Sequence, residues 1–174
     1  KFVWRSEAEF GLEAEAFETL ENQALLQFPV LPFFDAFAGL RVDTPDGPDR
    51  LHGVVGLTGL TPQWFEVDAS LFVSDHPFFR LETEYEALIT NRIVLTPAVE
   101  IDLPFADDAA IGVGAWGPQF ESGARLRYDL VDRLLSPYVG VHYEFVLGET
   151  ADMRRADGED TDAFYFVVGA RMLF

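Results

Sequence analysis

Histidines and carboxylates at alternate positions are the side chains in this sequence best suited to chemistry. His142 and Glu144 are two residues apart, so on a strand both side chains point to the same side. His52 falls in a second stretch of alternating polar residues. Imidazole is a good ligand for transition-metal ions, and a carboxylate can complete the site. The alternative is that each histidine is an ordinary hydrogen-bonding side chain of a polar interior.

Motifs of several other kinds of site are missing from the sequence. There is no cysteine, which excludes disulfides and thiolate metal sites. There is no glycine-rich phosphate loop and no helical His-x-x-x-His pair. Ser70, His52 and Asp68 could form a hydrolase-like set, but such a set can be assembled from almost any sequence. The sequence therefore predicts no enzyme, and a small hydrolase is the least favoured alternative.

The charge balance is strongly acidic. The 30 Asp and Glu residues outweigh the 12 Lys and Arg residues, which gives a formal net charge of -18 at pH 7. Nucleic acid and anionic membrane surfaces are poor partners for such a chain, whereas cations suit it. Lys occurs only at position 1, so arginine carries almost all the positive charge. Its planar group with several donors favours ion pairs in confined places.

The elements that position these residues are predicted by a strict two-residue alternation of apolar and polar side chains, which is typical of strands. Six runs show the alternation clearly, at 2–12, 65–74, 79–86, 92–103, 120–129 and 164–174. Weaker runs lie at 20–30, 34–43, 50–58 and 137–147. The pattern predicts about ten strands, each near the length of a tilted membrane-spanning strand. It predicts no helix of useful length, and no uncharged stretch approaches the roughly 20 residues that a membrane helix needs.

The predicted connections alternate between short and long. Short ones lie near 29–33, 59–63, 88–91 and 131–136, and longer acidic ones at 44–49, 106–117 and 148–161. Short turns on one rim and long loops on the other are typical of outer-membrane barrels. With an even number of strands, both termini would lie at the short-turn, periplasmic rim.

The alternation alone does not say which face of the sheet points outward, because a soluble barrel would hold its apolar face inside. The position of the glycines favours an apolar exterior. Small residues are useful where a narrow lumen is crowded, and most glycines within the predicted strands lie on the charged face. These are Gly11, Gly39, Gly56, Gly123, Gly140 and Gly169, against Gly53 on the other face.

Aromatic residues support the same orientation. They lie near strand ends on the apolar face, as in the girdles at membrane interfaces. They are Phe2, Trp4, Phe65, Phe79, Phe120, Tyr128, Phe164 and Phe174. The chain also ends on Phe174 in a final strand, which looks like the terminal signal read by the bacterial barrel-assembly machinery. We therefore expect an all-β fold, a transmembrane antiparallel up-and-down β-barrel of about ten strands that occupies residues 1–174.

The charged face would line the lumen of this barrel with an acidic ladder. Its acids are Glu7, Glu9, Glu66, Asp68, Glu82, Glu84, Glu86, Glu100, Glu121 and Glu144. The opposing arginines are Arg5, Arg41, Arg80, Arg92, Arg125, Arg127 and Arg171. One interpretation is an ion-pair network that fills a narrow barrel, since buried charges must be paired. The other is a cation path or binding surface, and both can hold.

Several blocks of the sequence resemble the copper resistance protein B family of outer-membrane proteins. The longest is residues 59–69, Gly-Leu-Thr-Pro-Gln-Trp-Phe-Glu-Val-Asp-Ala, followed by Phe72-Val73-Ser74. Further similar blocks lie within 81–97, 125–128, 137–141, 148–152 and 158–160. The likeness is clearest from about residue 50 to the end.

This resemblance implies a role in copper tolerance at the bacterial outer membrane. Family precursors look like a segment rich in Met and His followed by a barrel. Met153 and Met172 are the only methionines here, so we expect that segment to be absent from this chain. The chain begins at Lys1 with neither Met nor a signal peptide, and we expect a processed or trimmed form.

The resemblance also makes copper the expected ligand, bound weakly or transiently. The expected site residues are His142, Glu144, His52, Glu84 and Met153. His76 is expected to be merely solvated at a loop tip. The acidic loops around Asp107, Asp108, Glu159 and Asp160 should concentrate cations. A competing expectation is that Arg127 or another lumen arginine already occupies Glu144.

Three functions follow as expectations. The first is an outer-membrane copper resistance protein that binds copper or allows its limited passage through an acidic lumen. The second is a structural barrel with a closed ion-pair lumen, which anchors a missing copper-binding segment. The third is a small outer-membrane hydrolase. The expected partners are copper ions, outer-membrane lipid, the barrel-assembly machinery during folding and periplasmic copper proteins, but not nucleic acid.

Overall fold

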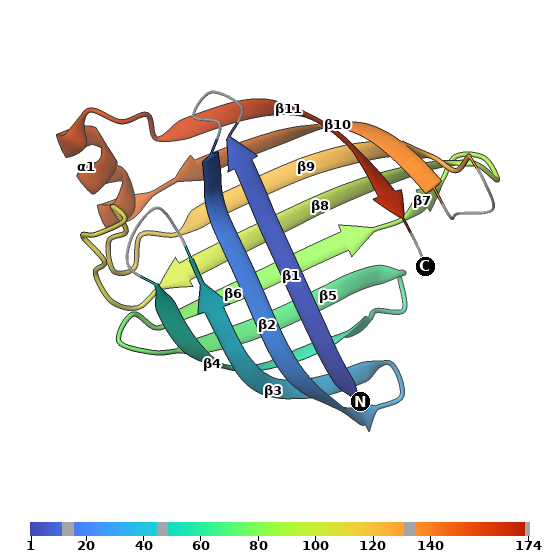
Figure 1. Ribbon diagram of the computed structural model, residues 1–174, viewed down its shortest axis with the longest axis horizontal. Helices are drawn as coiled ribbons and strands as arrows, with labels where there is room; N and C mark the ends of the chain where they lie inside the picture. The colour runs from blue at the N-terminus through green and yellow to red at the C-terminus, as the bar shows by residue number, and fades with distance from the viewer. Residues whose placement is uncertain (12–15, 45–48, 131–134, 173–174) are drawn as a thin grey trace.

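A computed structural model describes residues 1–11, 16–44, 49–130 and 135–172, with 6–11, 16–20, 171 and 172 described by their backbone alone. The described part is mainly antiparallel strand (Figure 1). The strands are β1 (Phe2–Gly11), β2 (Ala16–Leu31), β3 (Phe34–Asp43), β4 (Arg50–Leu60), β5 (Phe65–Val73), β6 (Phe78–Tyr85), β7 (Ala87–Leu88), β8 (Ile93–Pro104), β9 (Gln119–Tyr128), β10 (Leu135–Val146) and β11 (Asp162–Met172). The all-β prediction and its strand positions are confirmed.

The strands follow one another across the sheet in chain order. The order is β1-β2-β3-β4-β5-β6-β8-β9-β10-β11, and the two-residue β7 pairs with β8 beside this path. Every pairing is antiparallel, so the topology is up-and-down, as predicted. The marked termini lie on the side of the short β2–β3 and β4–β5 turns, away from α1 and the long loops (Figure 1).

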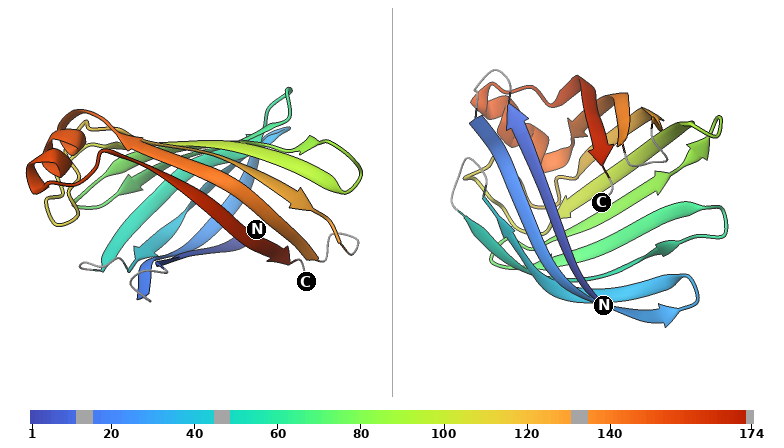
Figure 2. Two further views of the ribbon diagram at one scale, coloured as in Figure 1. Left: turned by 90° about the horizontal axis from the view of Figure 1, so that it is seen from above. Right: turned by 45° about the vertical axis from the view of Figure 1, so that its right-hand side comes forward.

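The sheet is strongly curved rather than flat (Figure 2). Side chains therefore meet across its concave side: Arg5 of β1 lies 2.8 Å from the carboxylate of Asp68 on β5. β1 and β11 stand at the two ends of the strand order, and within the described ranges no pairing joins them. The observed structure is thus a curved up-and-down sheet, and the closed barrel remains an expectation.

Burial follows the alternation along several strands, most clearly β4, β5 and β10. On β5, Phe72 is 1 % exposed, whereas its neighbours Leu71 and Val73 are 37 % and 55 % exposed. The concave side holds a buried apolar cluster of Leu25, Phe37, Val54 and Phe72. It also holds the buried polar side chains of Arg41, His52, Ser70 and Thr96. The predicted separation of the two faces is confirmed: the charged face is the concave one, and the apolar face is the convex one.

The glycines behave as a crowded interior requires. A Cβ atom added at Gly56 would lie 2.5 Å from the Phe37 ring, and one at Gly169 would lie 2.5 Å from the Tyr138 ring. At Gly53, on the outer face, the nearest atom would be 3.7 Å away. The asymmetry noted in the sequence therefore has a steric cause.

One predicted loop is wrong. Within 148–161 the chain forms the helix α1 (Gly148–Asp157). Its charges suit the helix dipole, with Glu149 in the first turn and Arg154 and Arg155 in the last. Gly158 ends it in the left-handed conformation, with its N–H donated to the last carbonyls. The segment carries no apolar stripe, so periodicity gave no sign of it.

No helix within the described residues is long and apolar enough to cross a membrane. Phe174 and the centre of the predicted 131–136 turn lie outside the described residues, as does most of the 44–49 loop.

Candidate functional site

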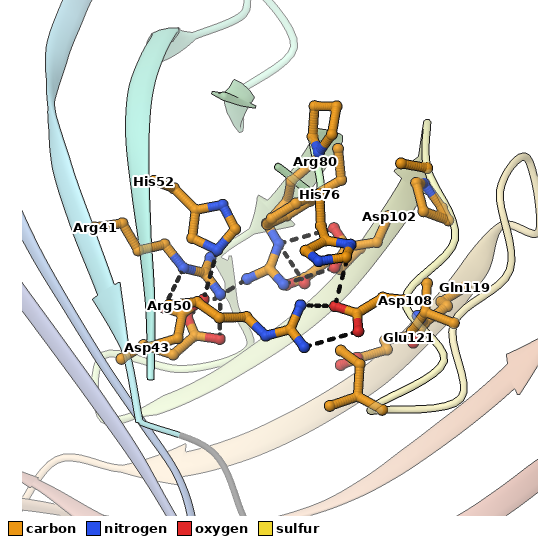
Figure 3. Close-up of a pocket in the computed structure, with 18 of the residues that line it drawn as sticks. Arg41, Asp43, Arg50, His52, His76, Arg80, Asp102, Asp108, Gln119 and Glu121 are labelled. Carbon is orange, nitrogen blue, oxygen red and sulfur yellow. Dashed lines mark hydrogen bonds and ion pairs between the residues drawn. The ribbon is translucent and has the colours of Figure 1, made fainter. Parts of the chain in front are cut away.

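A polar cavity of about 360 Å³ opens inside the sheet at the long-loop rim (Figure 3). Its walls come from the end of β3, the start of β4, the β5–β6 loop, β6, the end of β8 and the loop that leads to β9. These segments are far apart in the chain. They meet because every second connection of an up-and-down sheet returns to the same rim.

Arg41 is the buried cation of the β3 wall. Only 4 % of it is exposed, and it donates to Glu21 Oε1 and to Asp43 Oδ1, both at 2.6 Å. Its guanidinium also lies 4.7 Å from the centre of the Phe72 ring and 5.4 Å from that of Phe78. Paired carboxylates and aromatic faces are what a buried guanidinium needs, so this charge is held in place.

Arg80 of β6 is the hub of the ion pairs. It donates to both oxygens of Asp102, at 2.8 and 2.6 Å, in a bidentate pair. It also lies 2.9 Å from Glu100 and 3.8 Å from Glu21 across the curved sheet. A network of ion pairs inside the sheet was one of the two interpretations of the charged face, and the structure contains it.

The β8–β9 loop folds over the cavity and is fastened by charge. Asp108 is buried and forms a bidentate ion pair with Arg50 at the start of β4. His76, in the β5–β6 loop, hydrogen-bonds through Nδ1 to the carbonyl of Asp107 at 3.0 Å. Figure 3 shows these side chains converging on the cavity.

One expectation about this rim is wrong. His76 is not merely solvated, because it bonds the opposite loop and lines the cavity. Asp108, in one of the loops expected to concentrate cations, is paired with Arg50. Arg50 itself was absent from the predicted set of lumen arginines. These contacts depend on how a loop folds back, including a bridge between Asp108 and Val113, and a two-residue period carries no information about that.

His52 lies on β4 and is the direct partner of Arg41 in the pairing of β3 with β4. Its Nε2 lies 3.4 Å from Asp43 Oδ2, and its ring packs edge-on against Phe72 and Phe78. His52 is 3 % exposed, and its Nδ1 is buried without a hydrogen-bond partner.

A row of carboxylates crosses the concave face, and two of its members, Glu100 and Glu121, also line the cavity. Its members stand directly opposite one another on five neighbouring strands: Asp68, Glu82, Glu100, Glu121 and Glu144. Like charges in such positions destabilise a sheet unless cations or donors offset them. Arg5 offsets Asp68, Arg80 offsets Glu100, and the hydroxyl of Tyr165 donates to Glu144 at 3.2 Å.

His142 and Glu144 lie at the β10 end of this row. Nε2 of His142 is 3.3 Å from Glu121 on β9, and Glu121 is paired across the sheet with Glu144. The expected competitor does not occupy Glu144: Arg127 instead lies 3.1 Å from Glu86 and 3.3 Å from Asp129.

The other expected site residues lie elsewhere. Glu84 is on β6 and shares a lateral row with His142, but β8 and β9 stand between them. His52 is on β4 at the rim cavity, and Met153 is on α1. Across the part of the chain that the structure describes, no group of three or more His, Cys, Asp or Glu side chains is placed to hold a metal ion.

The family model described as copper resistance protein B precursor (CopB) matches residues 1–174. Copper resistance protein B of Escherichia coli is 36 % identical over 159 residues, which are 90 % of this chain and 53 % of that protein. A copper resistance protein B homolog of Pseudomonas syringae pv. tomato is 35 % identical over 159 residues, 90 % of this chain and 54 % of that protein. The chain thus spans about half the length of these curated relatives, and it belongs to the copper resistance protein B family.

Proposed function

We propose that this chain is the outer-membrane barrel of a copper resistance protein, and that its acidic interior binds copper or lets it pass in limited amounts. The observation that carries the proposal is the inverted burial of the sheet. Charged and polar side chains fill the concave face, while large apolar side chains such as Leu57, Val139 and Phe166 are exposed on the other. In a family named for copper resistance, this arrangement suits a lipid-embedded wall around a cation-attracting interior.

The ends of the strands and the two edge strands of the sheet also suit a membrane. Exposed aromatics stand near strand ends, including Phe2, Trp4, Tyr128 and Phe164, as interfacial girdles do. Lipid also penalises unpaired strand edges, so β1 and β11 should pair in the membrane. Both edges belong to an even-numbered up-and-down path, so they run antiparallel and can close the barrel. The word precursor in the family description fits an exported protein, with the barrel-assembly machinery as its partner during folding.

Copper is the proposed cargo, and the interior offers it imidazoles beside carboxylates. His142 with Glu121 forms one such pair, and His52 with Asp43 forms another. Carboxylates alone favour harder ions, whereas imidazole nitrogen suits copper. Because each of these pairs offers few ligands, it should bind copper weakly and reversibly. Movement of copper through the interior requires such weak binding. Glu84 and Met153 would be secondary contacts, and periplasmic copper proteins would exchange the ion.

A specific observation favours a second candidate function. Arg41 and Arg80 hold carboxylates from β2, β3 and β8 in one network, which narrows the interior. In this view the barrel is a closed anchor, and copper is bound by parts of the longer protein. The family is named for resistance and not for a reaction, and we propose no enzymatic activity.

Calorimetry separates the two candidates. The chain would be titrated with copper as wild type, as His142→Ala and as His52→Ala. An open interior predicts binding that weakens in at least one variant and also weakens as pH falls, because a protonated imidazole cannot ligate. The matched control is Asp157→Asn, in an exposed residue at the end of α1. Affinity unchanged in both histidine variants would favour the closed anchor.

A further inference from the structure

Two imidazoles on the wall of the rim cavity each have one ring nitrogen that faces an oxygen acceptor. Nε2 of His52 faces a carboxylate oxygen of Asp43 at 3.4 Å, and a carboxylate can only accept. Nδ1 of His76 faces the backbone carbonyl of Asp107 at 3.0 Å, which also can only accept. In the neutral ring each of these nitrogens therefore carries the hydrogen, and the other nitrogen of each ring keeps its lone pair.

This is the arrangement that metal-binding histidines use. A ligating imidazole is normally fixed by a carboxylate or a carbonyl at its second nitrogen, which sets both the tautomer and the ring direction. The nitrogen left over in His52, Nδ1, is buried and has no hydrogen-bond partner in the protein. A buried acceptor without a partner is unfavourable, so its position needs an explanation.

We propose that Nδ1 of His52 and Nε2 of His76 form a two-imidazole copper site in the rim cavity. The proposal rests on the function proposed above, since it takes copper as the cargo. It adds a ligand, His76, and a place, the loop side of the interior. His76 is 41 % exposed and His52 is almost fully buried, so the pair leads from the outside to the interior.

The surroundings suit a copper ion that is held briefly. Six carboxylates and four guanidiniums line the cavity, so negative charge is in excess. Two of these guanidiniums are paired, Arg41 with Asp43 and Arg50 with Asp108, although Nη1 of Arg41 and Nε of Arg50 have no hydrogen-bond partner. Among the described residues no third histidine or carboxylate completes a metal group here. Two nitrogen ligands are enough for Cu(I), and a site with so few protein ligands releases its ion readily.

The test compares His76→Gln with wild-type protein in detergent, using Cu(I) kept reduced and a competing chromophoric chelator. Glutamine can still donate to the Asp107 carbonyl but offers no imidazole lone pair. Even the loss of an outer partner of a ligating histidine costs about 10–100-fold in metal affinity, so the loss of the ligand should cost at least that. X-ray absorption should count two imidazoles on copper in the wild type. Asp75→Asn, in the same exposed loop, is the matched control and should bind as the wild type does.

Each outcome decides the proposal. Weaker binding in His76→Gln with one imidazole fewer supports it, provided that folding, checked by circular dichroism, is unchanged. Wild-type affinity and an unchanged imidazole count in His76→Gln would overturn the pair, while interior copper binding would still stand. No binding of Cu(I) by the wild type would overturn the pair, and a titration with Cu(II) would then decide whether the proposed interior copper site stands.

Discussion

Arg80 shows how single residues hold the interior together. Its guanidinium contacts Asp102 and Glu100 of β8 and Glu21 of β2. Breaking a buried ion pair from one side leaves an uncompensated charge, which is more costly than the net contribution of the pair itself.

We expect Arg80→Leu to lower the free energy of unfolding by about 3–5 kcal/mol, since Asp102 and Glu100 would lose their cation while Glu21 would keep Arg41. Arg155→Leu is the control, because Arg155 pairs with Asp152 on the surface of α1, where solvent screens the pair. Urea unfolding in detergent micelles or lipid vesicles measures both variants. Equal, small losses would show that the network contributes little to stability.

Gly56 gives a second prediction at this scale. Alanine there would place Cβ 2.5 Å from Phe37 and from a backbone carbonyl, whereas Gly53→Ala meets nothing closer than 3.7 Å. Overpacking costs about 1–3 kcal/mol. Gly56→Ala should therefore lower the urea midpoint of unfolding and Gly53→Ala should not. If both variants changed the urea midpoint equally, crowding would not explain why the glycines lie on the charged face.

The side of the sheet to which each strand residue points was predictable from the sequence. The contacts that loop residues make were not. Alternation placed His52, His142 and the acidic row on the concave face, because a strand leaves each side chain only two directions. The Arg50–Asp108 pair and the role of His76 join segments up to 58 residues apart through a folded loop. Such contacts depend on tertiary geometry that no local period records.

Among the secondary-structure elements, α1 is the one helix of the described chain, and Thr150 anchors it. Its side chain is fully buried, and its hydroxyl contacts Gly114 N at 3.1 Å and Gly117 O at 2.8 Å. A helix of ten residues is marginal alone, so this link to the β8–β9 loop stabilises both.

We expect Thr150→Val to loosen α1 and the β8–β9 loop without disturbing the strands. The variant leaves a buried amide and a carbonyl without their partner, at a cost of about 1–3 kcal/mol. Trypsin should then cut faster after Arg154 and Arg155, and Thr150→Ser should restore the wild-type rate. Unchanged cleavage in Thr150→Val would mean that the helix is held by other contacts.

The strands were predictable as elements because each long one alternates over about ten residues. α1 was missed because a short polar helix shows neither a two-residue period nor an apolar stripe. Its end signal, Gly158 after two arginines, was present in the sequence and could have indicated it.

At the scale of the whole molecule, the exposed apolar face has to meet something other than water. We expect Leu71→Arg to lower folding stability in a bilayer by about 2–4 kcal/mol if the side chain lies near the midplane. Ile89→Arg is the control, because Ile89 is exposed in a short turn at the rim, where a charge reaches the interface. Equal tolerance of arginine at both positions in a vesicle folding assay would contradict a lipid-facing wall.

The order of the strands could be predicted from the sequence, whereas the sequence does not say whether β1 and β11 pair. Neighbouring strands are joined by turns, so their pairing follows from alternation and turn length. Pairing of the first and last strands would be the contact most distant in the chain, and no turn fixes it.

The most direct test of the central claim, that the acidic interior receives copper, is a copper-soaked crystal of this chain read by anomalous scattering. The proposal predicts a copper peak on the concave side of the sheet, beside His52 and His76 or beside His142 and Glu144. Copper found only on the outer surface, or no peak with the interior filled by the Arg80 network alone, would contradict it.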